Sequence, residues 1–222
     1  MTELDSWHAQ VSEDIIEPER PIIDPHHHLW RMGTPYELED LWADTKAGHN
    51  ITGTVFIECG AEYRTDGPVA LQPVGETEYV VAQAKQARKG EAPGKPPILG
   101  IVSHADLTLG AAVVDVLQAH QESAEGLLRG IRHSTAFYPD PPAVDRYAGR
   151  VAELMLQPSF REGFAQLSSA GLSYDAWLLH TQITELTDLA RAFPDTTIIL
   201  DHFGGPLGIG PFSGKQAELF PQ

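Results

Sequence analysis

Short apolar segments alternate with helical patterns along almost the whole of this 222-residue chain. The apolar segments are nearly continuous and rich in β-branched and aromatic residues, which is typical of strands buried on both faces. The intervening segments place apolar residues at helical spacing, and Gly90 marks the end of the first long helix. We expect strands at residues 22–28, 53–59, 98–103, 127–133, 172–180 and 197–202, helices at 76–89, 109–123, 159–170 and 181–193, and a short helix or ordered loop at 36–49.

This alternation predicts an α/β fold with a parallel sheet, and two such folds compete. A doubly wound sheet usually carries a glycine-rich nucleotide-binding turn after its first strand, where this chain has histidines instead. A (β/α)8 TIM barrel carries its chemistry at the C-terminal ends of several strands. We expect the barrel, because titratable residues stand at six strand ends: His26, His28, Glu58, His104, Arg132, His133, His180 and His202.

The charge balance narrows the range of partners. The formal net charge is −16, from 31 acidic against 15 basic residues. Nucleic acids and anionic membranes attract surfaces rich in lysine and arginine, so we expect neither as a partner. We expect a small-molecule substrate for this single domain with 42% hydrophobic residues, and we leave a homo-oligomer open. The single cysteine, Cys59, the lack of a membrane-length apolar run and an acidic N-terminus without a signal pattern predict a cytoplasmic protein.

The first expected strand ends in the sequence Asp24-Pro25-His26-His27-His28. Side chains alternate between the faces of a strand, so Asp24, His26 and His28 would share one face. Two neutral imidazoles on one face can chelate Zn²⁺ or a similar metal ion, and Asp24 would orient one of these ligands. The segment therefore predicts a hydrolytic metal site, with ordinary surface histidines as the alternative.

Three motifs resemble the amidohydrolase-related branch of the amidohydrolase superfamily, and the similarity runs from about residue 20 to the C-terminus. They are D-P-H-H-H-L-W at 24–30, G-I-R-H at 130–133 and L-D-H-F-G-G-P at 200–206. This branch of TIM-barrel enzymes includes lactonases that act on fuconolactone and on pyrone-dicarboxylate compounds, and nonoxidative decarboxylases. The resemblance implies hydrolysis of a lactone or a similar carbonyl C–O or C–N bond in a small carboxylated or sugar-derived substrate, with decarboxylation as the alternative.

The resemblance also implies roles for individual residues. His26 and His28 match the metal pair of the first strand, and His180 matches the third histidine ligand. His202 matches a histidine that supports the ligands, acts as acid or base, or binds metal in binuclear relatives, and Arg132 matches a residue that faces the substrate. No lysine ends the fourth strand, so we expect one metal ion, with zinc as the candidate. Because some lactonases of this branch work without a metal, metal-independent catalysis is the alternative.

The sequence departs from the family pattern at its C-terminal end. Family members continue past the G-G-P motif with two further strand–helix units, and the eighth strand carries the aspartate that binds metal or acts as the general base. This sequence ends at Gln222, so six strands are accounted for and we find no candidate for that aspartate. We therefore expect an N-terminal extension at 1–20 and an incomplete, truncated barrel domain at 21–222, for which an inactive remnant is a further alternative.

The remaining titratable residues have alternatives of their own. Glu58 and His104 would contact the substrate or the metal, or would be ordinary polar residues at the barrel rim. Arg132 would bind a substrate carboxylate through its planar guanidinium, and its alternative is a structural salt bridge with Glu58. We expect three further histidines at the surface: His8, His49 and His120.

Overall fold

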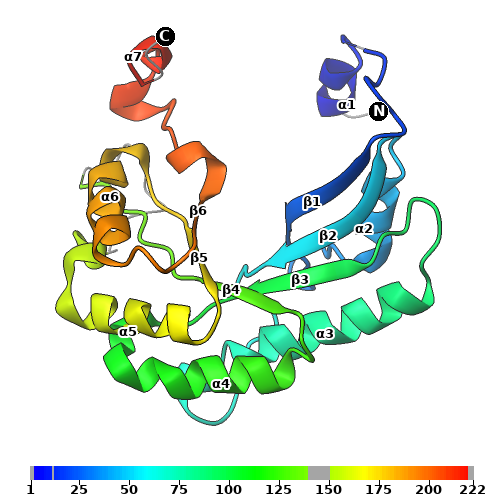
Figure 1. Ribbon diagram of the computed structural model, residues 1–222. Coiled ribbons are helices and arrows are strands. Elements are labelled where there is room, and N and C mark those ends of the chain that lie inside the picture. Colours follow the sequence, from blue (N-terminus) through cyan, green and yellow to red (C-terminus); the bar gives the residue numbers. More distant parts are fainter. Residues whose placement is uncertain (1–2, 12, 140–150, 220–222) are drawn as a thin grey trace.

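The computed structural model describes residues 3–11, 13–139 and 151–219. Its strands are β1 (Pro21–His27), β2 (Asn50–Ile57), β3 (Ile98–Ser103), β4 (Leu128–Arg132), β5 (Ser173–Ala176) and β6 (Ile198–Leu200). All neighbouring strands are parallel, and their order in the sheet is the order in the chain (Figure 1). A doubly wound sheet would change direction at a switch point, so this curled sheet is an incomplete TIM barrel, as the sequence predicts.

Seven α-helices are described, and the main ones lie on the outer, convex side of the sheet (Figure 1). They are α1 (Glu3–His8), α2 (Leu38–Thr45), α3 (Val74–Lys89), α4 (Val113–Ser123), α5 (Pro158–Ser169), α6 (Ile183–Ala192) and α7 (Gln216–Leu219). Short 3₁₀ turns join several elements: η1 (Val69–Leu71), η2 (Leu107–Ala112), η5 (Leu154–Leu156), η6 (His180–Gln182), η7 (Asp201–Gly204) and η8 (Gly210–Phe212). None of the described helices is long and apolar enough to cross a membrane.

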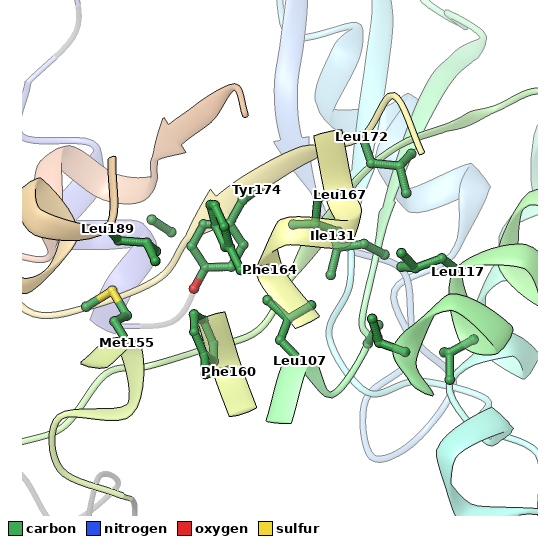
Figure 2. Packing of buried hydrophobic residues seen from close by; sticks show 14 of the residues in the cluster. Leu107, Leu117, Ile131, Met155, Phe160, Phe164, Leu167, Leu172, Tyr174 and Leu189 are labelled. Atoms are coloured by element: carbon green, nitrogen blue, oxygen red, sulfur yellow. The ribbon is translucent and has the colours of Figure 1, made fainter. Parts of the chain in front are cut away.

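The larger of two main cores packs α4 and α5 against the outer face of β4 and β5 (Figure 2). Tyr174 on β5 meets Phe164 and Phe160 of α5 edge to face, at centroid distances of 5.1 and 6.2 Å. Its hydroxyl donates a hydrogen bond to the carbonyl of His133 at 2.9 Å, just beyond the end of β4. The core therefore also fixes the C-terminal ends of two neighbouring strands, where barrel enzymes place their sites.

The last two strands are shorter than the sequence predicts. The pairing of β5 with β6 ends at Ala176 and Leu200, so the expected strand end at residue 180 was wrong. Beyond Ala176 the carbonyl of Trp177 accepts a hydrogen bond from the Thr135 amide at 3.0 Å, which joins the segments that follow β5 and β4. The apolar pattern continues there because Leu178 and Leu179 are buried within the loop, although they do not form a strand.

The prediction that His120 lies at the surface was also wrong, since it is fully buried on α4. Its Nε2 donates to the carbonyl of His104 at 2.9 Å, and its Nδ1 accepts from the hydroxyl of Thr77 at 2.8 Å. A histidine with partners at both nitrogens can be buried as the neutral form, and burial lowers the pKa of His120 to about 4. His49 is exposed as predicted, whereas the side chain of His8 lies outside the described part of the structure.

Candidate metal centre and active site

The histidine pair at the end of β1 lies at the open mouth of the curled sheet. The rings of His26 and His28 are 5.0 Å apart between centroids and nearly perpendicular. The Nδ1 atom of His28 donates to the carbonyl of Ile57 at 2.7 Å, because a carbonyl oxygen can only accept. The neutral ring of His28 therefore keeps a lone pair on Nε2, which is the form that binds metals.

Strict alternation along β1 is interrupted between Asp24 and His27, where its register with β2 shifts. In consequence Pro25 and His26 both line the inner cavity of the sheet, while His27 packs on Phe56 at the outer face. The Asp24 carboxylate accepts from the backbone amide of His26 at 3.0 Å. Asp24 thus supports His26 through the backbone, and not as its neighbour on one regular strand face.

A left-handed turn directly after β6 brings His202 to His26. His202 and Phe203 have φ values of 50° and 55°, which non-glycine residues rarely adopt, and two glycines continue the turn. At Gly205 a Cβ atom would lie 2.2 Å from the carbonyl oxygen of Leu178, so no larger residue fits there. The turn places the His202 ring 4.7 Å from that of His26, and strained backbone of this kind is concentrated at functional sites.

One group of residues among those described could hold a metal ion, namely His26, Asp201 and His202. The candidate ligand atoms of these three residues all lie within 4.8 Å of one another. The Nε2 atom of His26 is buried without a hydrogen-bond partner in the described structure. Burial first, and then the charges of His28, Arg132 and His202, lowers the pKa of His26 to about 4, so it is neutral at pH 7. A neutral imidazole, an aspartate and a second histidine are suitable ligands for a divalent ion.

Arg132 lies next to this group, and its guanidinium is already paired. Its Nε donates to the Glu58 carboxylate at 2.7 Å, its Nη1 to Asp201 at 3.3 Å, and its Nη2 to the Glu58 carbonyl. The salt bridge with Glu58, the alternative considered from the sequence, is therefore present. This buried arginine fixes the positions of two carboxylates at the mouth, one of which belongs to the candidate metal group.

Asp175 on β5 is a further buried carboxylate near this centre. It lines a cavity of about 430 Å³ together with His26, Asp201 and His202. Burial, and then the charge of Asp201, raises the pKa of Asp175 to about 7 against the opposing effect of Arg132. A carboxyl group that titrates near neutral pH in such a cavity is a candidate acid or base.

His180, predicted as the third histidine ligand, begins the 3₁₀ turn η6 four residues after β5. Its Nδ1 accepts from the Leu207 amide at 3.3 Å, and its ring packs on Phe212 at 4.6 Å between centroids. The accepting Nδ1 puts the proton of the neutral ring on Nε2, unlike the arrangement at His28. His180 and His28 are outside the group of three described above. Their assignment as ligands stays a prediction.

The sequence reasoning missed Asp175 and Asp201, although both left a signal. Asp201 directly precedes His202 in the L-D-H-F-G-G-P motif. Asp175 shares the inner face of β5 with Ser173, whose hydroxyl donates to it at 3.4 Å. A carboxylate near the end of an otherwise apolar parallel strand is costly to bury, and this cost is the signal for a functional cavity.

A model of the amidohydrolase family matches residues 23–216, which is most of the chain. The chain belongs to the amidohydrolase family. The uncharacterized protein y4mH of Sinorhizobium fredii is 33% identical over 206 residues of alignment, and the match covers 82% of this chain and 62% of that protein. This chain thus spans less than two thirds of that curated relative.

Solved structures of amidohydrolases share the fold. An amidohydrolase from Burkholderia multivorans with bound zinc has a TM-score of 0.56 at 19% identity, over 82% of this chain and 58% of that one. A putative 2-pyrone-4,6-dicarboxylic acid hydrolase from Pseudomonas putida has a TM-score of 0.53 at 16% identity, over 83% and 57%. At these identities the likeness concerns the fold alone, and it agrees with an incomplete TIM barrel.

Proposed function

We propose that this protein is a metal-dependent hydrolase that opens the ring of a lactone, with zinc as the candidate ion. The observation that carries the proposal is the convergence of His26, Asp201 and His202 at the mouth of an amidohydrolase barrel. The unpartnered, buried Nε2 of His26 supports it, because a polar atom in that position is costly unless a ligand occupies it. The zinc in the Burkholderia multivorans relative supports the choice of ion.

In this proposal the three residues hold the ion and the other buried groups organise the site. A divalent ion at this position would polarise the carbonyl of the substrate and lower the pKa of a water molecule. Arg132 positions Asp201 by donating to its carboxylate. Asp175 lines the same cavity and is our candidate for the group that accepts the proton of the attacking water.

The charges at the mouth favour an uncharged, sugar-derived lactone over a carboxylated substrate. Arg132 already faces Glu58 and Asp201, and Asp175 adds a third acidic group. A substrate carboxylate would compete with Glu58 and Asp201 for the one guanidinium of Arg132. The same argument counts against decarboxylation, which requires a bound substrate carboxylate.

Metal content and lactone hydrolysis test the proposal together. We expect the purified chain to retain about one zinc per molecule after dialysis and to hydrolyse sugar-acid γ-lactones, measured by proton release. The His26→Ala variant should bind zinc at least about 100-fold more weakly, whereas His49→Ala, an exposed histidine, should behave like the wild type. Zinc retained by His26→Ala would contradict the metal site. A zinc-loaded chain without any lactone hydrolysis would favour the inactive remnant.

A further inference from the structure

A second pocket opens at the same end of the sheet, between the loop that joins β2 to α3 and the loop that joins β3 to α4. Its volume is about 350 Å³, and its polar lining consists of Tyr63, Gln72, His104 and Asp106. Its lining residues differ from those of the inner cavity that holds the metal group. Arg132 joins the two regions, because its side chain holds Asp201 and its carbonyl contacts His104.

The hydrogen bond of His104 defines which of its nitrogens carries the proton. Its Nδ1 lies 3.0 Å from the carbonyl oxygen of Arg132, and a carbonyl oxygen can only accept. The Nδ1 atom must therefore donate, and the neutral ring keeps a lone pair on Nε2. No hydrogen bond to that Nε2 is present within the described residues, and the side chain to which it belongs lines the pocket.

A chain of buried hydrogen bonds connects the backbone carbonyl of His104 to His120 and Thr77. The His104 carbonyl accepts from Nε2 of His120, so Nδ1 of His120 must accept from the Thr77 hydroxyl. The single hydroxyl proton of Thr77 is then used, and Ser103 must donate to Thr77 across 2.7 Å. Every step of this chain has one permitted direction. Buried polar groups that are fully paired in this way are rigid, so the position of His104 is fixed before a ligand arrives.

We infer that His104 is a specificity-determining residue whose Nε2 accepts a hydrogen bond from a substrate hydroxyl bound in this second pocket. The inference rests on the proposed function, since it assigns the hydroxylated, non-reacting part of the lactone to this pocket. A lone pair on Nε2 binds a donor and repels a carboxylate, and the neighbouring Asp106 adds a negative charge. A neutral polyhydroxylated ligand is therefore the class that the pocket fits.

Two substitutions separate recognition by His104 from its structural role. In His104→Asn the side-chain amide can still donate to the Arg132 carbonyl from the position of Nδ1, but nothing remains at the position of Nε2. In His104→Gln the longer amide reaches the Nε2 position with its oxygen, while the bond to Arg132 is lost. We expect His104→Asn to melt close to the wild type and His104→Gln to melt at a lower temperature.

The probes are a hydroxylated γ-lactam and 2-pyrrolidinone, which lacks the hydroxyls; the amide bond of both is less reactive toward water than the ester bond of a lactone. Binding of both is titrated by NMR on the zinc-loaded 222-residue chain. The wild type should bind the hydroxylated lactam more tightly than 2-pyrrolidinone. The ratio of the two dissociation constants should fall about fivefold in His104→Asn and stay near the wild-type value in His104→Gln. Nitrogen-15 spectra of the ligand-free protein should show the proton of His104 on Nδ1.

The outcomes distinguish the inference from the proposed function. Equal binding of the two lactams by the wild type, or an unchanged preference in His104→Asn, would overturn the role of His104. A proton found on Nε2 would overturn it as well. If the lactam preference depends on His104 but the corresponding lactone is not hydrolysed, the inference stands and the proposed hydrolase activity fails.

Discussion

The two faces of the same sheet lie in different environments. On the outer face, Ile131 and Tyr174 are fully buried beneath the helices (Figure 2). On the inner face, Ile199 keeps 46% of its surface exposed, and Phe203 in the turn after β6 keeps 89%. Both faces carry apolar residues, but the inner face also carries the polar side chains of Ser173 and Asp175. Helices cover only the outer face of this incomplete barrel (Figure 1).

The two carboxylates of the candidate site are shielded from water, whereas His202 in the same group is exposed. Asp175 and Asp201 are only 3% and 4% exposed, although the apolar residues beside them on β6 are open. The ends of β1 and β6 converge there, as the short distance between the rings of His26 and His202 shows. The inner face thus combines exposed apolar residues with two buried carboxylates, and low exposure is what gives these charges their large effects.

The largest expected effect compares two phenylalanines in these different environments. Phe164→Ala removes a ring that is fully buried against Tyr174, and we expect it to lower the free energy of unfolding by about 4 kcal/mol. Phe203→Ala removes an exposed ring, and we expect a change within about 0.5 kcal/mol. Urea denaturation followed by circular dichroism measures both. Similar losses in the two variants would mean that the inner face is covered in solution and would break the comparison.

The sequence predicts the outer face well, because that face follows from local patterns. The limits of β3 are those expected, and α3 ends at Lys89 with Gly90 as its cap, as its helix-stop signal indicates. Alternation of apolar strands with helices was enough to predict the parallel order of the sheet. These features depend on neighbours in the sequence and on the general need to bury apolar surface.

The mouth is less predictable, because its geometry depends on irregular backbone. A register shift in β1 puts Pro25 and His26 on the same cavity, which strict alternation does not allow. A left-handed turn at His202 decides which histidine meets His26, and no simple period encodes it. His120 stands at one of the buried positions of α4, but a polar side chain there does not by itself indicate that it takes part in a buried hydrogen-bond network.

The second-largest expected effect is a pH dependence of stability that arises from the burial of Asp175. The pKa of Asp175 is about 7 in the folded protein, against an ordinary value of 3.8. Between these values the folded state keeps a proton that the unfolded state releases, so this group makes the protein less stable as pH rises, fully so above pH 7. Asp175→Asn cannot ionise, and its melting temperature should gain several degrees on the wild type between pH 5 and pH 8.

The exposed Asp66 provides the control for that measurement. Asp66→Asn should leave the difference from the wild type unchanged with pH, because the side chain at this position is in contact with water in the folded protein. A constant difference for Asp175→Asn as well would show that water reaches the mouth. The inner face would then be open to water along its whole length, including the surroundings of Asp175.

The smallest expected effect compares neighbouring isoleucines that point to opposite faces of β6. Ile198 packs against the outer core, whereas Ile199 lines the inner cavity and is 46% exposed. Threonine keeps a β-branched side chain and hence the preference for a strand, so a change to threonine mainly tests burial. Ile198→Thr should lower the free energy of unfolding by about 1.5 kcal/mol, and Ile199→Thr by about 0.5 kcal/mol or less.

Sedimentation of the same variants adds a second readout, because an exposed apolar edge strand is prone to pair with another chain. Ile199→Thr could instead destabilise the chain as much as Ile198→Thr and also lower self-association. A second molecule would then cover the inner face, and the two faces would differ only in the isolated chain.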